Sequence, residues 1–240
     1  MRIGVFDSGV GGLTVLKKLI DKYPNNEYIY YGDAKNIPYG EKTIEELKRL
    51  SCKIIDFLIS NNVDMIVIAC GTISSNIYEY LKSKYNIKII DIISPTIDFI
   101  NNSEYKKIGV LATRSTVNSK VFTNRLNKEV VEVACSNFVP LIENNRLEEV
   151  NEYFDMYLKD MKDVNLIVLG CTHYPIIRDR INSYFNGTIE LFNMADAIND
   201  ISNDGEGKVD LYFSKIDDSI INNVNLIIGD KFDSINLREV

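Results

Sequence analysis

Two stretches of eight residues decide the fold of this chain. Val63-Asp64-Met65-Ile66-Val67-Ile68-Ala69-Cys70 aligns without gaps with Val164-Asn165-Leu166-Ile167-Val168-Leu169-Gly170-Cys171, so that the two cysteines stand 101 residues apart. Each stretch is too continuously apolar for the edge of a sheet, which predicts a strand buried on both faces and hence a parallel sheet. Apolar strands resemble one another by chance, but the cysteine that ends both stretches favours an internal duplication.

The segments on either side of the first stretch alternate between strand and helix patterns. β-branched runs predict strands at Ile3–Phe6, Tyr28–Tyr31 and Lys88–Ile93. A helical period of apolar residues predicts helices at Leu13–Lys22, Thr43–Ser60 and Ser75–Lys84. Ser94-Pro95 predicts the start of a further helix, with serine as its N-cap. This alternation with short connections is typical of an α/β fold.

The pattern restarts at Lys107–Leu111, which is similar to Arg2–Phe6. We therefore predict two similar α/β lobes, each a mostly parallel sheet flanked by helices, with the active site in the cleft between them. The first lobe takes residues 1–97 and the second takes residues 98–207. After the polar loop Asn203–Lys208, residues 208–240 return to the first lobe, with strands and one helix expected at Val209–Phe213, Asp217–Asn222 and Leu226–Ile228.

Composition excludes several classes of protein. The 240 residues carry a formal net charge of −7, which argues against nucleic-acid binding through a basic face. No apolar run approaches the roughly 20 residues that span a bilayer, and the N-terminal strand-like run lacks the pattern of a signal peptide. Four cysteines without a Cys-x-x-Cys pair and a single histidine disfavour a zinc site. We expect a cytoplasmic protein with no nucleic-acid, membrane or metal partner.

Reactive side chains follow the predicted strands, where parallel sheets bind ligands. Lobes that face each other place Cys70 and Cys171 on opposite walls of one cleft. Each cysteine is expected just before a helix, whose N-terminus favours the thiolate and lowers the thiol pKa below about 8.5. Two thiols on opposite sides of a small molecule suit inversion at a carbon that bears hydrogen. One thiolate removes the proton from one face, and the opposing thiol delivers a proton to the other.

Two further residues stand beside these cysteines. Asp7 follows the first strand and His173, the only histidine, follows Cys171 by two residues, so both are candidates to assist proton movement. The alternative for any free cysteine is a small buried hydrophobe. We accept that alternative for Cys52 and Cys135, which lie inside apolar helix or strand patterns.

A glycine-rich turn, Asp7-Ser8-Gly9-Val10-Gly11-Gly12, connects the first strand and helix. It is not a dinucleotide fingerprint, because Thr14 stands where the third glycine is required. Bare N–H groups at a helix start suit a carboxylate as well as a phosphate. The alternative is a tight turn that lets helix and sheet pack closely.

Other candidates are weaker. Tyr39-Gly40 follows a strand and is equally explained as a plain turn. Thr113 and Thr116 mirror Asp7-Ser8 in the second lobe, although Thr116 is also placed to cap the following helix. Glu143 ends the apolar run Val139–Glu143, which is interpreted as a strand end, and an exposed acid is the alternative.

Together these residues resemble the glutamate racemase family of the aspartate/glutamate racemase superfamily. The matching segments lie between residue 1 and about residue 192 and comprise Gly4–Val15, Tyr31-Gly32-Asp33 with Pro38-Tyr39-Gly40, Ala69-Cys70-x-Thr72, and Gly170-Cys171-Thr172-His173-Tyr174-Pro175. The first and last of these motifs are long and specific.

The resemblance implies a cofactor-independent enzyme that interconverts L- and D-glutamate and supplies D-glutamate for bacterial peptidoglycan, often as a homodimer. It implies Cys70 and Cys171 as the acid/base pair, with Asp7, His173 and Glu143 as helpers. It also implies substrate contacts from a set of small polar residues and glycines, namely Ser8, Tyr39, Gly40, Gly71, Thr72, Thr113, Thr116 and Thr172.

Two positions depart from the family pattern. Gly71 stands where the family usually has an asparagine that contacts the substrate, and losing a charge-assisted hydrogen bond costs roughly 1.5–3 kcal/mol of binding. The turn Phe192–Asp196 also differs. These departures leave open a racemase of another amino acid such as aspartate, with Gly71 opening space, or an inactive amino-acid-binding paralogue. A cysteine hydrolase built on Cys171 and His173 ranks last, because it leaves Cys70 unexplained.

Overall fold

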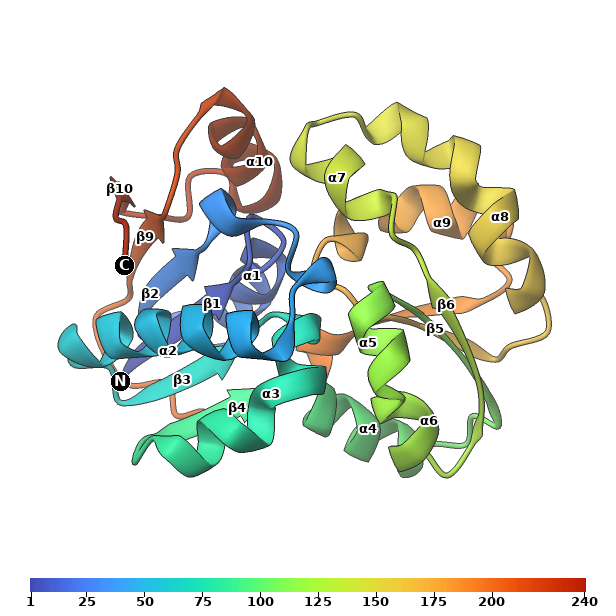
Figure 1. Ribbon diagram of the computed structural model, residues 1–240, viewed down its shortest axis with the longest axis horizontal. Coiled ribbons are helices and arrows are strands. Elements are labelled where there is room, and N and C mark those ends of the chain that lie inside the picture. The colour runs from blue at the N-terminus through green and yellow to red at the C-terminus, as the bar shows by residue number, and fades with distance from the viewer.

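The computed structural model describes residues 1–240 and contains two separate sheets built only from parallel strands. Figure 1 shows two lobes side by side, with both chain termini in the lobe that holds the first sheet. That sheet has the order β10-β9-β2-β1-β3-β4. Its strands are β1 (Arg2–Asp7), β2 (Glu27–Gly32), β3 (Met65–Ile68), β4 (Lys88–Asp91), β9 (Lys208–Phe213) and β10 (Ser234–Leu237).

The second sheet has four strands, arranged in the same order as strands β2, β1, β3 and β4 of the first sheet. Its order is β6-β5-β7-β8, which corresponds strand by strand to β2-β1-β3-β4. Its strands are β5 (Lys107–Ala112), β6 (Glu129–Ala134), β7 (Leu166–Leu169) and β8 (Glu190–Asn193). The two aligned sequence stretches form β3 and β7, each fully buried and each beside the first strand of its sheet. The predicted α/β fold with two similar lobes is confirmed.

Helices fill the connections between these strands. They are α1 (Leu13–Lys22), α2 (Ile44–Ser60), α3 (Gly71–Lys84), α4 (Ile93–Asn101), α5 (Arg114–Ser119), α6 (Val121–Arg125), α7 (Phe138–Glu143), α8 (Phe154–Leu158), α9 (Arg178–Tyr184) and α10 (Asp218–Ile228). Helix α2 begins with a capping box. Thr43 Oγ1 accepts a hydrogen bond from Glu46 N, and Glu46 Oε2 accepts one from Thr43 N. None of the helices combines the length and the apolar character that crossing a membrane requires.

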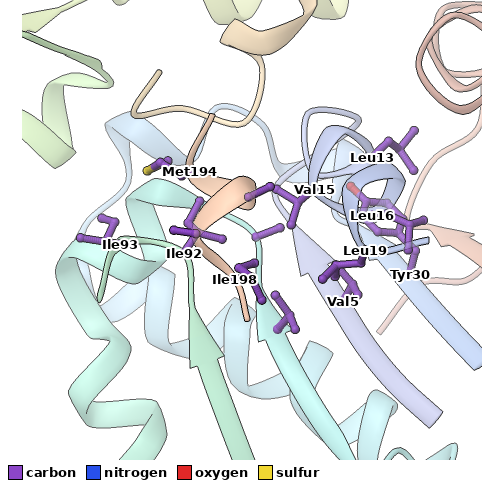
Figure 2. Packing of buried hydrophobic residues seen from close by; sticks show 14 of the residues in the cluster. Val5, Leu13, Val15, Leu16, Leu19, Tyr30, Ile92, Ile93, Met194 and Ile198 are labelled. Atoms are coloured by element: carbon purple, nitrogen blue, oxygen red, sulfur yellow. The ribbon is translucent and has the colours of Figure 1, made fainter. Parts of the chain in front are cut away.

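The largest hydrophobic cluster belongs to both lobes. It includes Val5 of the first sheet and Val110 of the second. Figure 2 shows how the lobes are joined, with Met194 and Ile198 lying between Val15 of α1 and the start of α4. Met194 begins the 3₁₀ turn η6 (Met194–Ala197), so the turn that departs from the family pattern is part of the junction between the lobes.

Two local expectations are wrong. Leu226–Ile228 is not a strand but the end of α10, and the last strand is β10, which the sequence pattern missed. Ser94 is not an N-cap, because α4 already begins at Ile93 and the Asp91 carboxylate accepts from the N–H groups of Ile93 and Ser94. A side chain two residues upstream of the helix thus does the capping.

Candidate active site

The two lobes enclose a cavity of about 50 Å³ at the carboxyl ends of their sheets. It is lined by ten of the residues that the sequence singled out: Ser8, Tyr39, Gly40, Cys70, Gly71, Thr72, Thr113, Cys171, Thr172 and His173. The other three, Asp7, Glu143 and Thr116, lie behind the lining and contact it through hydrogen bonds. Residues 165 positions apart in the chain are thereby brought together.

Cys70 and Cys171 reach the cavity from different lobes. Cys70 is the residue directly before α3, and Cys171 follows β7 after one intervening glycine. Their exposed fractions are 4% and 6%, and neither forms a disulfide. The Cys70 thiol donates to Ser8 Oγ over 3.9 Å. Each sulfur is thus shielded from bulk water but open to a molecule in the cavity.

The expected lowering of the Cys70 pKa is wrong. Burial raises the pKa of the Cys70 thiol well above its ordinary value, and the nearby carboxylate of Asp7 raises this pKa further. Burial and the Asp7 carboxylate raise this pKa more than the N-terminus of α3 lowers it. The reason is that a thiolate in a closed site loses more stabilisation from water than one helix end supplies. The raised pKa favours the neutral thiol form of Cys70.

Cys171 contacts His173, which in turn contacts Glu143. Its Sγ lies 3.6 Å from Nδ1 of His173, and Nε2 of His173 lies 2.5 Å from Oε1 of Glu143. The expectation that Glu143 ends a strand is wrong: it is the last residue of α7. Helix α10 holds this position, because Asn223 Nδ2 donates to the Glu143 carbonyl oxygen over 3.4 Å and Ser219 Oγ also donates to it.

His173 is held in its charged form. Burial alone would lower the pKa of His173, but its hydrogen bonds to Cys171 and Glu143 and the charge of Glu143 raise this pKa well above its ordinary value. His173 is 2% exposed and Glu143 11%. A protonated imidazole that donates from both nitrogens therefore bridges the thiol and the carboxylate.

Asp7 lies behind the cavity floor. Its Oδ2 accepts from Gly12 N at 2.7 Å and from Thr172 Oγ1 at 3.2 Å, whereas its buried Oδ1 has no partner. Burial is the main cause that raises the pKa of Asp7, and the charge of His173 and the hydrogen bonds from the backbone oppose this only in part. The unpartnered oxygen is therefore a place where a proton can reside.

The glycine-rich turn is occupied by the protein's own carboxylates. Val10 N donates to Glu143 Oε1 over 3.2 Å, and Gly12 N donates to Asp7. A Cβ on Gly11 would stand 2.4 Å from Nδ1 of His173, so the turn packs against the second lobe as closely as glycine allows. The close-packing interpretation of this motif is the one that the structure favours.

Hydroxyl groups line the cleft between α3 and α5. Thr72 Oγ1 lies 2.9 Å from Thr113 Oγ1, which donates to Thr116 Oγ1 over 3.1 Å. The helix cap is Thr113, which accepts from the N–H of Thr116, and not Thr116 itself. Tyr39 also lines the cavity, but its hydroxyl donates to Asp33 Oδ2 over 2.5 Å. The tyrosine ring is thus fixed in place by Asp33.

Sequence reasoning missed several lining residues, namely Pro38, Glu41, Arg114, Cys135, Ser136, Val139 and Pro140. The sequence pattern favours a core position for Cys135, and this residue is fully buried, yet it also lines the cavity. It directly follows β6, so the rule that ligands bind at strand ends could have found it. Arg114 is the only Lys or Arg in the lining. No group of three or more His, Cys, Asp or Glu side chains is placed to hold a metal ion.

Known proteins share this architecture. The family model for Asp/Glu/hydantoin racemases matches residues 3–198. A glutamate racemase of a Hydrogenobaculum species is 35% identical in an alignment that covers 97% of this chain and 95% of that protein. A glutamate racemase isoform from Bacillus anthracis superposes with a TM-score of 0.91 at 25% identity, covering 100% of this chain and 97% of that one. A Francisella tularensis glutamate racemase in complex with D-glutamate gives 0.86 at 28% identity, covering 99% and 97%. The chain therefore belongs to the Asp/Glu/hydantoin racemase family, and within it to the glutamate racemases.

Proposed function

We propose that this protein is a glutamate racemase that interconverts L- and D-glutamate without a cofactor. The observation that carries this proposal is the pair of buried cysteines that line one cavity from two lobes. Inversion at the α-carbon needs an acid and a base on opposite faces of one molecule. The 35% identity to glutamate racemases along nearly the whole chain supports glutamate as the substrate.

The reaction consists of two proton transfers. A cysteine thiolate forms an S–H bond with the α-proton, and the electron pair of the broken C–H bond stays on the α-carbon, stabilised by the adjacent carboxylate. The opposing thiol then gives its proton to the other face of that carbon and becomes a thiolate. The enantiomer is released with the roles of the two cysteines exchanged, so the same site works in both directions.

The two cysteines have different neighbours. Burial and the Asp7 carboxylate raise the pKa of Cys70, which favours its thiol form and hence the role of proton donor. Cys171 has the His173 imidazolium within 3.6 Å, and that cation can donate a hydrogen bond to a thiolate sulfur. We assign Asp7 to Cys70 and the pair of His173 and Glu143 to Cys171 as proton-handling helpers.

The lining supplies groups for an amino acid. We assign the hydroxyls of Ser8, Thr72, Thr113 and Thr172 to the polar ends of glutamate, together with the backbone at Tyr39-Gly40 and Gly71. Thr116 acts through Thr113, because its hydroxyl oxygen accepts a hydrogen bond from the Thr113 hydroxyl. The idea that Gly71 opens space for another amino acid lacks support, because the Gly170 carbonyl oxygen occupies the place of its side chain.

The remaining assignments follow from the family. We propose residues 1–97 with 208–240 and residues 98–207 as the two domains, a homodimer as the assembly, and D-glutamate for peptidoglycan as the product that the cell uses. The four free cysteines support a reducing compartment such as the cytoplasm.

Polarimetry tests the proposal. Pure L-glutamate and pure D-glutamate, each incubated with the purified protein, should both lose optical rotation until the two enantiomers are equal. A parallel set of L-amino acids, including aspartate, should react much more slowly. A preference for a different amino acid, or no change of rotation with any of them, would contradict the proposal.

A further inference from the structure

Helix α10 contacts the end of the helix that carries Glu143. In the chain, α10 lies between β9 and β10 of the first sheet, whereas α7 lies between β6 and β7 of the second. Figure 1 shows the two helices next to each other at the junction of the lobes. Three polar side chains meet at the Glu143 carbonyl, namely Ser219 and Asn223 of α10 and Asn145, which follows α7. The backbone of a proton-handling residue is therefore attached to the other lobe.

The Glu143 carbonyl receives its hydrogen bonds from outside α7. A helix leaves its last four carbonyl groups without donors of its own. The three carbonyls before that of Glu143 accept from the N–H groups of residues 144–146, which follow the helix. The Glu143 carbonyl instead accepts from Ser219 Oγ and, over 3.4 Å, from Asn223 Nδ2. Helix α10 thus completes the end of α7 at the residue whose side chain enters the site.

The Glu143 side chain is held at its other end. Its Oε1 accepts from Val10 N over 3.2 Å and lies 2.5 Å from Nε2 of His173. A Cβ on Gly9 would stand 2.4 Å from this same oxygen, so the glycine-rich turn leaves no space on that side. The carboxylate meets His173 only while the backbone at residue 143 keeps its place, and the bonds from α10 act on that backbone.

Asn223 carries a cost that packing alone does not explain. Its side chain is fully buried, and its Nδ2 donates to the Glu143 carbonyl and, over 3.0 Å, to the Ser219 carbonyl oxygen. Its buried Oδ1 has no partner. An unpaired buried oxygen destabilises a fold, and an apolar side chain of similar size would avoid this. What the amide supplies is therefore its two donated hydrogen bonds.

We propose that Ser219 and Asn223 are positioning residues that hold Glu143 in contact with His173 and thereby support proton transfer at Cys171. Neither of them lines the cavity, so both act through Glu143. The role of Cys171 rests on the proposed racemase function. The placement of Glu143 against His173, in contrast, is a property of the folded protein without substrate, so the two can be tested apart.

The first readout is the pKa of His173, measured by NMR without substrate in Ser219→Ala, in Asn223→Leu and in the double variant. Contact with Glu143 raises this pKa, so weaker positioning should lower it. We expect a fall of about half a unit in each single variant and of about one unit, a tenfold change in the protonation equilibrium, in the double variant. An unchanged pKa in the double variant would overturn the proposal.

The other titratable groups that face His173 stay in place in these variants. They are Cys171 on its own segment and Asp7 of β1. Neither is hydrogen-bonded to Ser219 or Asn223. A lower pKa of His173 in the variants therefore reports the contact with Glu143.

Racemisation supplies the second readout. In the double variant kcat should fall about tenfold, which is part of the roughly 100-fold or larger contribution of acid–base groups. KM should stay within about twofold of the wild-type value, because neither side chain touches a molecule in the cavity. A rise in KM with an unchanged kcat would contradict the proposal. A wild-type protein without activity would instead refute the racemase function and leave the result on the pKa of His173 standing.

Ile228→Ala is the matched control. Ile228 is buried at the last position of α10, roughly 14 Å from Ser219 along the helix. Its truncation loosens the same helix but removes no hydrogen bond to Glu143. The pKa of His173 should stay at the wild-type value even though the free energy of unfolding falls. An equal fall of this pKa in the control would attribute the effect to general loosening and overturn the proposal.

Ser219 alone carries the test if Asn223→Leu does not fold. Ser219→Thr keeps the hydroxyl that donates to the Glu143 carbonyl, whereas Ser219→Ala removes it. The threonine variant should retain the wild-type pKa of His173 and the wild-type kcat, and the alanine variant should lower both. Equal values in the two variants would contradict a role for this hydrogen bond.

Discussion

His173 and Glu143 form a largely buried pair, and one carboxylate oxygen of Glu143 contacts both lobes. Nε2 of His173 lies 2.5 Å from Oε1 of Glu143, and the same oxygen accepts from Val10 N of the first lobe at 3.2 Å. The carboxylate thus orients the imidazole and also fastens the glycine-rich turn to the second lobe.

Glu143→Gln should lower the pKa of His173 and slow racemisation. The amide keeps the shape of the side chain but removes the charge that helps to raise this pKa. Because the chain has a single histidine, an NMR titration reports this pKa without assignment ambiguity. We expect a fall in kcat of about 100-fold, in the range of lost acid–base assistance. Glu148→Gln, which alters an exposed acid paired with Arg180, should change neither quantity.

His173→Asn should destabilise the protein in a pH-dependent way. The folded pKa of His173 is raised, so the protonated ring stabilises the folded state fully below its unfolded pKa of about 6.5. This contribution is lost as pH rises through the folded pKa. The difference in free energy of unfolding between wild type and variant, measured in urea, should therefore shrink as pH rises from 6 to 9. A difference that stays constant or grows would contradict the charged pair.

Cys70→Ser and Cys171→Ser should each reduce inversion at least about 1,000-fold, because a hydroxyl is a far weaker base than a thiolate and one face loses its acid–base group. Chiral chromatography of the product measures this loss. Cys52→Ser is the control, since Cys52 lies in α2 away from the cavity and should keep wild-type activity. Comparable losses of activity in all three variants would contradict the assignment of Cys70 and Cys171 as the acid–base pair.

Tyr30→Phe should weaken both stability and activity. The buried Tyr30 hydroxyl donates to the Gly9 carbonyl oxygen over 2.5 Å and so fixes the turn that contacts Glu143. Losing this bond should lower the free energy of unfolding by about 1–2 kcal/mol and kcat/KM several-fold. Tyr28→Phe is the matched control on the same strand, because the Tyr28 hydroxyl bonds the Leu19 and Tyr23 carbonyls far from the site. It should reduce stability alone.

The parts of the fold that could be predicted are those with a local signal. The buried runs at β3 and β7 identified the repeat, and cysteines at their ends identified the cavity. Val139–Glu143, by contrast, is a short apolar run whose period does not distinguish helix from strand. Its helical state and the direction of Glu143 depend on packing against α10, a contact between segments about 80 residues apart.

The electrostatics and the contact between the lobes could not be predicted for the same reason. The helix after Cys70 is visible in the sequence and favours a low thiol pKa, whereas the opposing burial and the position of Asp7 depend on tertiary packing. Likewise, Gly71 looks like a lost asparagine until Gly170 is seen against it. The pKa of Cys70 and the contact of Gly71 with Gly170 both depend on residues that are distant in the sequence and close in the fold.

The most direct test of the account is the fate of the α-proton when the wild-type protein converts L-glutamate to D-glutamate in D2O. With one cysteine removing the proton and the other delivering one from solvent, the first D-glutamate formed should carry deuterium at the α-carbon, while the remaining L-glutamate stays largely protiated. D-glutamate that retains the original α-hydrogen, or a protein that leaves both enantiomers unchanged, would contradict two-cysteine inversion.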